Sequence, residues 1–291
     1  MRVLITGAAG LFGHGLVRVF AEHHDVTPLT RAGADITDAS AVRAFIGAAC
    51  PDVVIHAAAI PDLDVCEEHP AEAHRVNVEG TRNVIEAARS AGSAVVYIST
   101  DAVFDGRATT PYTETDPANP PSVYGRTKLE GERMVARLAA HWIVRVSVLF
   151  GPRGPGNSKP DFVEKGLRKL ARGEEYVVAS DQLGSALYTL DGARVIEQLL
   201  FAKAFGVYHL SNQGACTRYN LARLAAQFAG LDARLIVGRP LSEMRRPGPR
   251  LRYGVMALEG LVRAGIRLSR RWQPALEEHV RSLGFPSSKE G

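Results

Sequence analysis

The chain has 291 residues, of which 46% are hydrophobic and 23% charged, and its formal net charge at pH 7 is +4. This is the profile of a soluble globular protein that is long enough to bury a substantial core. The basic residues are spread along the chain, so we expect no nucleic-acid partner. No apolar run approaches the roughly 20 residues that span a bilayer, so we expect no membrane partner.

The cysteine pattern argues against a disulfide framework and against a zinc site. Cys50, Cys66 and Cys216 form an odd set without a C-x-x-C spacing, which suits the cytosol. The N-terminal stretch MRVLITGAAG enters a glycine loop rather than a cleavage site, so it lacks the form of a signal peptide. We therefore expect a cytoplasmic protein without a metal site.

In the first half of the chain, short apolar runs alternate with longer segments of helical spacing. The runs, which we predict to be strands, cover residues 3–5, 26–29, 52–59, 94–100 and 143–150. The segments predicted to be helical cover residues 11–22, 70–91 and 123–140. Strands that alternate with helices predict βαβ units, an α/β fold and a parallel sheet. The near-continuous apolar runs fit strands that are covered on both faces.

The pattern changes after Gly151, where the stretch GPRGPGNSKP predicts a loop. Beyond it, short strand candidates lie at 176–178, 207–210 and 234–237. They mix with predicted helices at 161–172, 191–204, 218–229 and 273–283. We interpret this half as a smaller C-terminal α/β subdomain that packs against the first.

The stretch TGAAGLFG joins the first strand to the first helix and places Gly7, Gly10 and Gly13 at three-residue steps. A tight turn, the close approach of a pyrophosphate and close helix–strand packing each require a residue without a Cβ. The helix that follows offers free N–H groups to an anion. The stretch therefore predicts a dinucleotide site, in which the contacts include the intervening Leu11 and Phe12.

The end of the second strand bears on the choice of dinucleotide. An NAD site usually has an acidic residue there, which binds the ribose hydroxyls, but this strand ends in Thr30 and Arg31. An arginine fits a 2′-phosphate, so NADPH is favoured and NADH is kept as the alternative. Asp35 and Ile36 follow and are expected near the adenine.

Tyr124 and Lys128 stand four residues apart in the stretch YGRTK, so they share a face of the predicted helix. An ammonium group beside a phenol favours the phenolate, and we expect Lys128 to lower the pKa of Tyr124 toward the range useful for proton transfer. Thr100 ends the strand at 94–100, at the edge of a parallel sheet where such folds place their chemistry. Its hydroxyl can bind a substrate carbonyl oxygen.

These motifs resemble those of extended short-chain dehydrogenases/reductases and, more narrowly, of the dTDP-4-dehydrorhamnose reductase group. The resemblance is carried by TGAAGLFG, HAAA, ISTDAVFDG, YGRTK and DQLGS, and it covers nearly the whole chain. It implies a Rossmann-type doubly wound parallel sheet. Residues 1–150 would form an NAD(P)-binding domain. Residues 151–291 would mainly form a substrate-binding subdomain, with some segments that return to the first sheet.

The resemblance also implies NADPH-dependent reduction of a nucleotide-linked 4-keto-deoxysugar. Thr100 and Tyr124 would polarise and protonate the ketone, while Lys128 would hold the ribose. Asp101 would contact the sugar, and the cofactor would be lined by Ala57, Ala58 and Ala59. The other predicted substrate contacts are Val148, Gln182, Arg246 and Arg250, the two arginines as partners for a phosphate.

The sequence departs from the reductase pattern at Val148, where the group typically carries a tryptophan that packs on the substrate. Two alternatives therefore stay open. One is a nucleotide-sugar epimerase or dehydratase of the same superfamily. The other is a regulatory subunit that binds NADP without turnover, like the β subunit of methionine adenosyltransferase. The predicted partners are a nucleotide sugar and a second copy of the chain in a homodimer.

Overall fold

The computed structural model describes residues 1–154, 157 and 159–285. Its centre is a six-stranded sheet in which every neighbouring pair is parallel. In spatial order the strands are β10 (Gly206–Leu210), β5 (His141–Val146), β4 (Ala94–Thr100), β3 (Val53–His56), β1 (Arg2–Thr6) and β2 (Asp25–Leu29). The order reverses between β1 and β3. Doubly wound sheets bind ligands at such a switch point, beyond the carboxyl ends of the strands.

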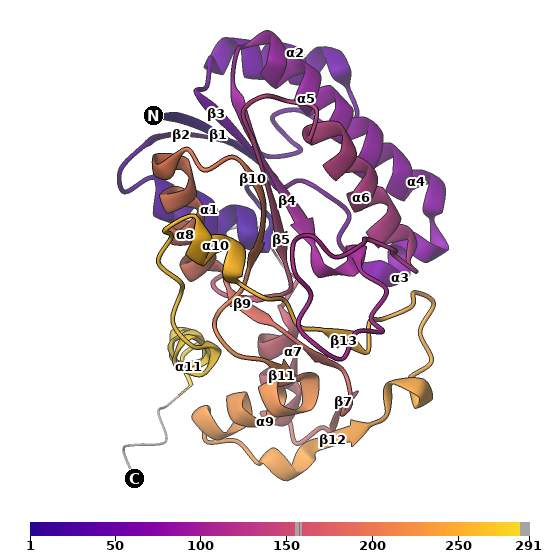
Figure 1. The fold of residues 1–291 in the computed structure, drawn as a ribbon. Coiled ribbons are helices and arrows are strands. Elements are labelled where there is room, and N and C mark those ends of the chain that lie inside the picture. The colour runs from indigo at the N-terminus through magenta and orange to yellow at the C-terminus, as the bar shows by residue number, and fades with distance from the viewer. Residues whose placement is uncertain (155–156, 158, 286–291) are drawn as a thin grey trace.

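Helices cover both faces of this sheet, as Figure 1 shows. One face carries α1 (Leu11–Phe20), α8 (Thr189–Ala202) and the short α10 (Glu259–Arg263). The other carries α2 (Ala39–Ala49), α5 (Gly80–Ser90) and α6 (Val123–Val135). Two large apolar clusters fill the space between sheet and helices. This confirms the predicted parallel sheet buried on both faces.

The segment at 70–91, predicted as one helix, is interrupted. It consists of α4 (Pro70–His74), a π-helical turn at Arg75–Glu79, and α5; the short α3 (Leu63–Glu68) precedes it. Asn77 in the widened turn accepts from the Ile60 N–H at 2.8 Å and donates to its carbonyl at 3.1 Å. It also donates to the Thr127 hydroxyl of α6 at 3.1 Å. The turn thus fixes the loop after β3 against α6.

The part of the second half of the chain outside α8, β10 and α10 lies beyond the carboxyl ends of the main strands (Figure 1). Its helices are α7 (Phe162–Leu170), α9 (Arg218–Phe228) and α11 (Trp272–Ser282). Its strands form small sheets: β7 (Tyr176–Ala179) with β12 (Ile236–Arg239), β8 (Leu183–Gly184) with β11 (Cys216–Thr217) and β13 (Tyr253–Gly254), and β6 (Val148–Phe150) with β9 (Ala186–Tyr188). Single 3₁₀ turns cover Asp101–Val103, Ala233–Leu235 and Leu241–Glu243. Although it comes late in the chain, β10 pairs with β5 at the edge of the main sheet.

The run at 143–150, predicted as one strand, is two strands in different sheets. β5 ends at Val146 and pairs with β4, whereas β6 begins at Val148 and pairs with β9. Ser147 lies between them, and its hydroxyl donates to the Asp101 carboxylate at 2.5 Å. The chain therefore leaves the main sheet at Ser147, whose side chain contacts the residue that follows the neighbouring strand β4.

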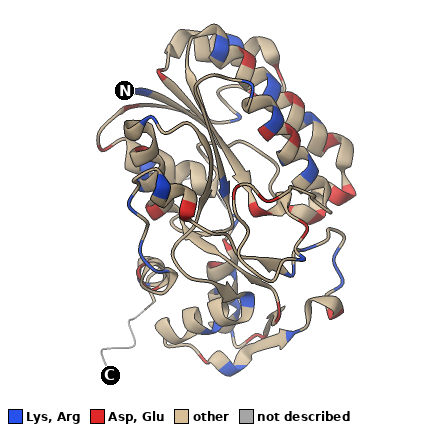
Figure 2. Ribbon diagram, in the orientation of Figure 1, with Lys and Arg blue, Asp and Glu red and all other residues tan. Residues whose placement is uncertain are grey.

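Charged residues of both signs are interspersed along the helices that cover the sheet, as Figure 2 shows. Within the described part of the chain, no helix is long and apolar enough to cross a membrane. In the same residues, no cluster of three or more His, Cys, Asp or Glu side chains has the arrangement needed to hold a metal ion.

Candidate active site

Two cavities adjoin beyond the carboxyl ends of the main strands. The glycine-loop cavity, of about 720 Å³, is lined by the loop after β1. The arginine cavity, of about 700 Å³, is lined by Arg218, Arg246 and Arg250. Residues in both linings are Leu11, Pro61, Tyr124, Val146, Leu149, Pro160 and Asp161. Tyr124 therefore lies at the boundary between the two cavities.

The glycine loop packs tightly on its neighbours while leaving the cavity open. Gly7 has a φ of +67°, and a Cβ on it would come within 2.7 Å of the Ala58 nitrogen. A Cβ on Gly13 would collide with the Gly7 carbonyl oxygen. The first N–H groups of α1 have no acceptor within the helix, so they suit an anion. The loop thus has the compact backbone and the free donors that a pyrophosphate requires.

At the far end of the glycine-loop cavity, Arg31 pairs with Asp35. The Arg31 Nε lies 3.1 Å from Asp35 Oδ2, and the arginine side chain is 80% exposed. Hydrogen bonds from Thr37, with a smaller contribution from Arg31, lower the pKa of Asp35. Ile36 follows, buried against Gly80. Arg31 is therefore placed to meet a 2′-phosphate, in competition with a carboxylate of its own chain.

Helix α6 presents Tyr124 and Lys128 to the cavities because it lies very close to β4. Ser122 caps the helix by accepting from the Gly125 N–H at 3.0 Å. A Cβ on Gly125 would collide with the Ala102 carbonyl oxygen, and one on Gly131 with the Tyr97 hydroxyl. Lys128 is only 2% exposed. The glycines let α6 approach the strand end that carries Thr100.

The sequence predicts a lowered pKa for Tyr124, but in the structure the pKa is raised. Burial raises this pKa, the Thr100 hydroxyl offsets part of the rise, and the Asp101 charge adds to it. Burial likewise lowers the pKa of Lys128 to about 7, against a smaller opposing effect of Glu132. Because burial disfavours the charged form of Lys128, this lysine cannot set the pKa of Tyr124. Desolvation therefore outweighs the expected effect of the ammonium group.

Thr100 and Asp101 line the arginine cavity at the end of β4. The Thr100 hydroxyl accepts from the Ala102 N–H at 3.1 Å and donates to Asp101 at 3.2 Å. Burial raises the pKa of Asp101, and the hydrogen bond from Ser147 and the charge of Arg218 oppose that rise. Both side chains are thus held by short local contacts at the end of β4.

Behind the strand ends, His56 is wholly buried between two threonines. Its Nδ1 lies 2.7 Å from the Thr6 hydroxyl and its Nε2 lies 2.9 Å from the Thr81 hydroxyl. Burial lowers its pKa to about 3, so the ring is neutral at ordinary pH. The ring joins β1, β3 and α5 and keeps the glycine loop beside the Ala57–Ala59 segment.

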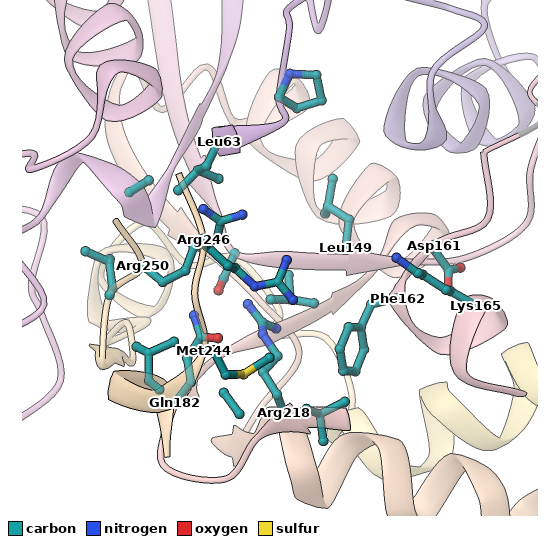
Figure 3. Close-up of a pocket in the computed structure, with 18 of the residues that line it drawn as sticks. Leu63, Leu149, Asp161, Phe162, Lys165, Gln182, Arg218, Met244, Arg246 and Arg250 are labelled. Atoms are coloured by element: carbon teal, nitrogen blue, oxygen red, sulfur yellow. The ribbon is translucent and has the colours of Figure 1, made fainter. Parts of the chain in front are cut away.

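The arginine cavity holds the remaining predicted residues. Arg250 donates to both oxygens of Asp64 at 2.8 Å, while Arg246 lies 3.6 Å from the same carboxylate. Figure 3 shows Arg218 and Arg246 directed toward the middle of the cavity, with Phe162 and Lys165 at another side. Gln182 and Val148 complete the predicted set.

Every residue predicted for the site lines at least one of the two cavities. Sequence reasoning missed several other lining residues, namely Ser147, Phe162, Lys165, Tyr176, Arg218 and Met244. They come from elements far apart in the chain and carry no motif. Arg218, at the first position of α9, has no sequence feature that distinguishes it from the other arginines of the chain.

Comparison with known proteins gives a consistent family. The family model described as "RmlD substrate binding domain" matches residues 1–284. The dTDP-4-dehydrorhamnose reductase of Mycolicibacterium smegmatis is 37% identical over 97% of this chain and 86% of its own length. The spore coat polysaccharide biosynthesis protein SpsK of Bacillus subtilis is 35% identical over 96% of each chain. The crystal structure of dTDP-4-dehydrorhamnose reductase from Bacillus anthracis in complex with NADP is 31% identical, with a TM-score of 0.91 over 97% of this chain and 99% of that one. On the combined agreement of sequence and fold, the chain belongs to the RmlD substrate binding domain family.

Proposed function

We propose that this protein reduces the 4-keto group of a dTDP-linked deoxysugar and that it uses NADPH as the cofactor. The observation that carries the proposal is the position of Tyr124 at the boundary of the two cavities. A phenol there can reach a group on either side. The relatives named as dTDP-4-dehydrorhamnose reductases, and the NADP complex of one of them, support the same chemistry.

The glycine-loop cavity suits a dinucleotide because the loop beside it is compact. A Cβ at Gly7 or Gly13 would collide with backbone atoms and push the loop out of this conformation. The N–H groups at the start of α1 would bind the pyrophosphate, and Arg31 would bind the 2′-phosphate. Ala57, Ala58 and Ala59 would line the remaining wall. When bound, NADPH supplies a hydride for the keto carbon.

The proton for the keto oxygen would come from Tyr124. Because burial raises its pKa, the phenol stays protonated at neutral pH and can act as the donor. Thr100, which lines the arginine cavity together with Tyr124, would orient the oxygen, and Lys128 would hold the ribose. The nucleotide diphosphate would lie near Arg246, whose charge is only loosely paired at 3.6 Å.

We further propose that residues 1–150 bind the cofactor and residues 151–291 mainly bind the substrate. This follows the division of the cavity linings between the two halves of the chain. A cytosolic location agrees with the three cysteines, all of which are free. The homodimer implied by the family resemblance is a prediction that sedimentation analysis can test.

The direct test mixes purified protein and NADPH with a panel of 4-keto dTDP-sugars that includes the rhamnose precursor. We expect loss of nicotinamide absorbance and a product with two more hydrogens than the substrate. The panel is needed because the arginine cavity has Val148 at the position where the reductase group typically carries a tryptophan. An epimerase or dehydratase would leave the net oxidation state unchanged. A regulatory subunit would bind NADPH without consuming it in the presence of any sugar.

A further inference from the structure

Arg218 is a half-buried cation that faces the arginine cavity without a close counter-ion. No carboxylate of the described residues lies within the 4.0 Å that defines an ion pair with its guanidinium. Its neighbour Arg250 is neutralised by the paired Asp64, whereas Arg218 is not. Figure 3 shows the side chain directed into the cavity. A half-buried guanidinium without an ion-pair partner in such a position is suited to an acceptor on a ligand.

The position of Arg218 is fixed by the fold. It is the first residue of α9, and Thr217 caps that helix by accepting from the Asn220 N–H at 3.0 Å. The Arg218 N–H itself donates to the Gln182 carbonyl at 3.2 Å. The guanidinium carbon lies 5.7 Å from the centroid of the Phe162 ring. A guanidinium held this way presents its donors in one direction and loses little entropy on binding.

Among the charged groups around Arg218, Asp101 has the largest effect on the pKa of its guanidinium. Burial lowers the pKa of Arg218, and the Asp101 carboxylate is the leading influence against that shift. The two groups line the same cavity yet form no ion pair among the described residues. Asp101 follows Thr100 directly, so the space between Asp101 and Arg218 adjoins the reacting centre. A group that bridges them must accept from one side and donate to the other.

A sugar hydroxyl does both. We propose that Arg218 determines specificity for the sugar: its guanidinium donates to a ring hydroxyl that in turn donates to the Asp101 carboxylate. The site therefore binds sugars that carry this hydroxyl, at C2 or C3, in preference to analogues that lack it. This inference rests on the proposed function, because it assigns the sugar-side contacts of that same cavity. It differs from phosphate binding, for which the ligand would have no proton to give to Asp101.

The test is calorimetric binding to the protein saturated with NADP⁺, with dTDP, dTDP-rhamnose and dTDP-hexoses that lack the C2 or C3 hydroxyl as probes. Arg218→Met should weaken binding of dTDP-rhamnose by about 10- to 100-fold, as expected for lost hydrogen bonds from a charged donor. It should leave binding of dTDP unchanged and abolish the preference for the hydroxylated sugar over the corresponding deoxy form. Arg218→Lys, which keeps the charge without the fork, should fall between the two.

Arg223→Met is the matched control, because Arg223 is exposed on the same helix; it should bind every probe as the wild type does. Unchanged NADPH affinity shows that each variant is folded. If Arg218→Met weakens dTDP as much as dTDP-rhamnose, the arginine serves the diphosphate and the proposal is wrong. If it weakens neither, the proposal is equally wrong. A wild type that binds dTDP but neither binds nor reduces any dTDP-sugar would instead refute the proposed function.

Discussion

The Lys128 ammonium lies over the face of the Tyr97 ring, with Nζ 3.9 Å from the ring centroid. This contact replaces only part of the hydration that the charge loses on burial, since the lysine has no ion pair within 4.0 Å among the described residues. Glu132, one turn along α6, is occupied by Arg145 at 2.8 Å and by Ser99. The Lys128 ammonium is thus poorly solvated in the folded chain, and ribose hydroxyls can accept hydrogen bonds from it.

Because the Lys128 ammonium is poorly solvated, we predict that the free energy of unfolding depends on pH. The pKa of Lys128 is about 7 in the folded chain against 10.5 for an unperturbed lysine. Between these values the unfolded state binds more protons, so the lysine makes the free energy of unfolding rise with pH. Relative to Lys128→Met, the wild type should gain up to about 1.4 kcal/mol for each pH unit from about pH 7.5 to about pH 9.5. Urea unfolding of both proteins without cofactor measures this gain. Parallel curves would contradict it.

The glycine loop makes a second prediction. Gly13→Ala should lower the free energy of unfolding by about 1–3 kcal/mol, because the new Cβ meets the Gly7 carbonyl oxygen and the backbone must move. It should also weaken NADPH binding. Gly47→Ala in α2 is the control: its Cβ meets nothing within 4 Å, and the helix should gain about 0.5–1 kcal/mol. Urea unfolding and NADPH titration check both, and equal behaviour of the two variants would refute the packing argument.

The Arg31–Asp35 pair makes a third prediction, on cofactor preference. Arg31→Gln should reduce the ratio of kcat/KM for NADPH over that for NADH by about 10-fold, since a charge-assisted contact to the 2′-phosphate is lost. Asp35→Asn should raise the ratio, because it frees the guanidinium from its partner at 3.1 Å. Steady-state kinetics with both cofactors give the ratio. No change in Arg31→Gln would mean that Arg31 does not contact the phosphate.

Local sequence patterns predicted the elements that line the glycine-loop cavity. The strand at 94–100 coincides with β4, and the glycine loop follows β1 as expected. These features depend on short-range chemistry: the period of apolar residues, a glycine that must take positive φ, and the i, i+4 spacing of Tyr124 and Lys128. Such information is present in any window of about 15 residues.

The remainder depended on contacts between distant segments. The apolar run at 143–150 does not indicate that Ser147 donates a hydrogen bond to Asp101. Nor does it indicate that the residues before and after Ser147 belong to different sheets. The direction of the Tyr124 pKa depends on burial by surrounding elements, which spacing does not show. Arg218 is distinguished only by the cavity that it enters. The sequence therefore predicted residues that line the two cavities, but not the burial and the charges around them.

Thr100 offers a fourth prediction. Thr100→Val should lower kcat by about 10- to 100-fold, because the hydroxyl that would turn from Asp101 to the keto oxygen is lost. Thr100→Ser keeps the hydroxyl that also accepts from the Ala102 N–H at 3.1 Å, so it should stay near wild type. Turnover with the best sugar of the panel, alongside NADPH affinity, separates a lost donor from a disturbed fold. A serine variant as slow as the valine variant would show that the methyl group, not the hydroxyl, matters.

The central claim is that Tyr124 gives the proton to the keto oxygen where the two cavities meet. The most direct measurement is the rate of NADPH oxidation by Tyr124→Phe and by the wild type with a 4-keto dTDP-sugar, under saturation with both ligands. We predict that the phenylalanine variant binds NADPH as tightly as the wild type and turns over at least ~100-fold more slowly, as expected for a lost general acid. Equal rates for the two proteins would contradict the account.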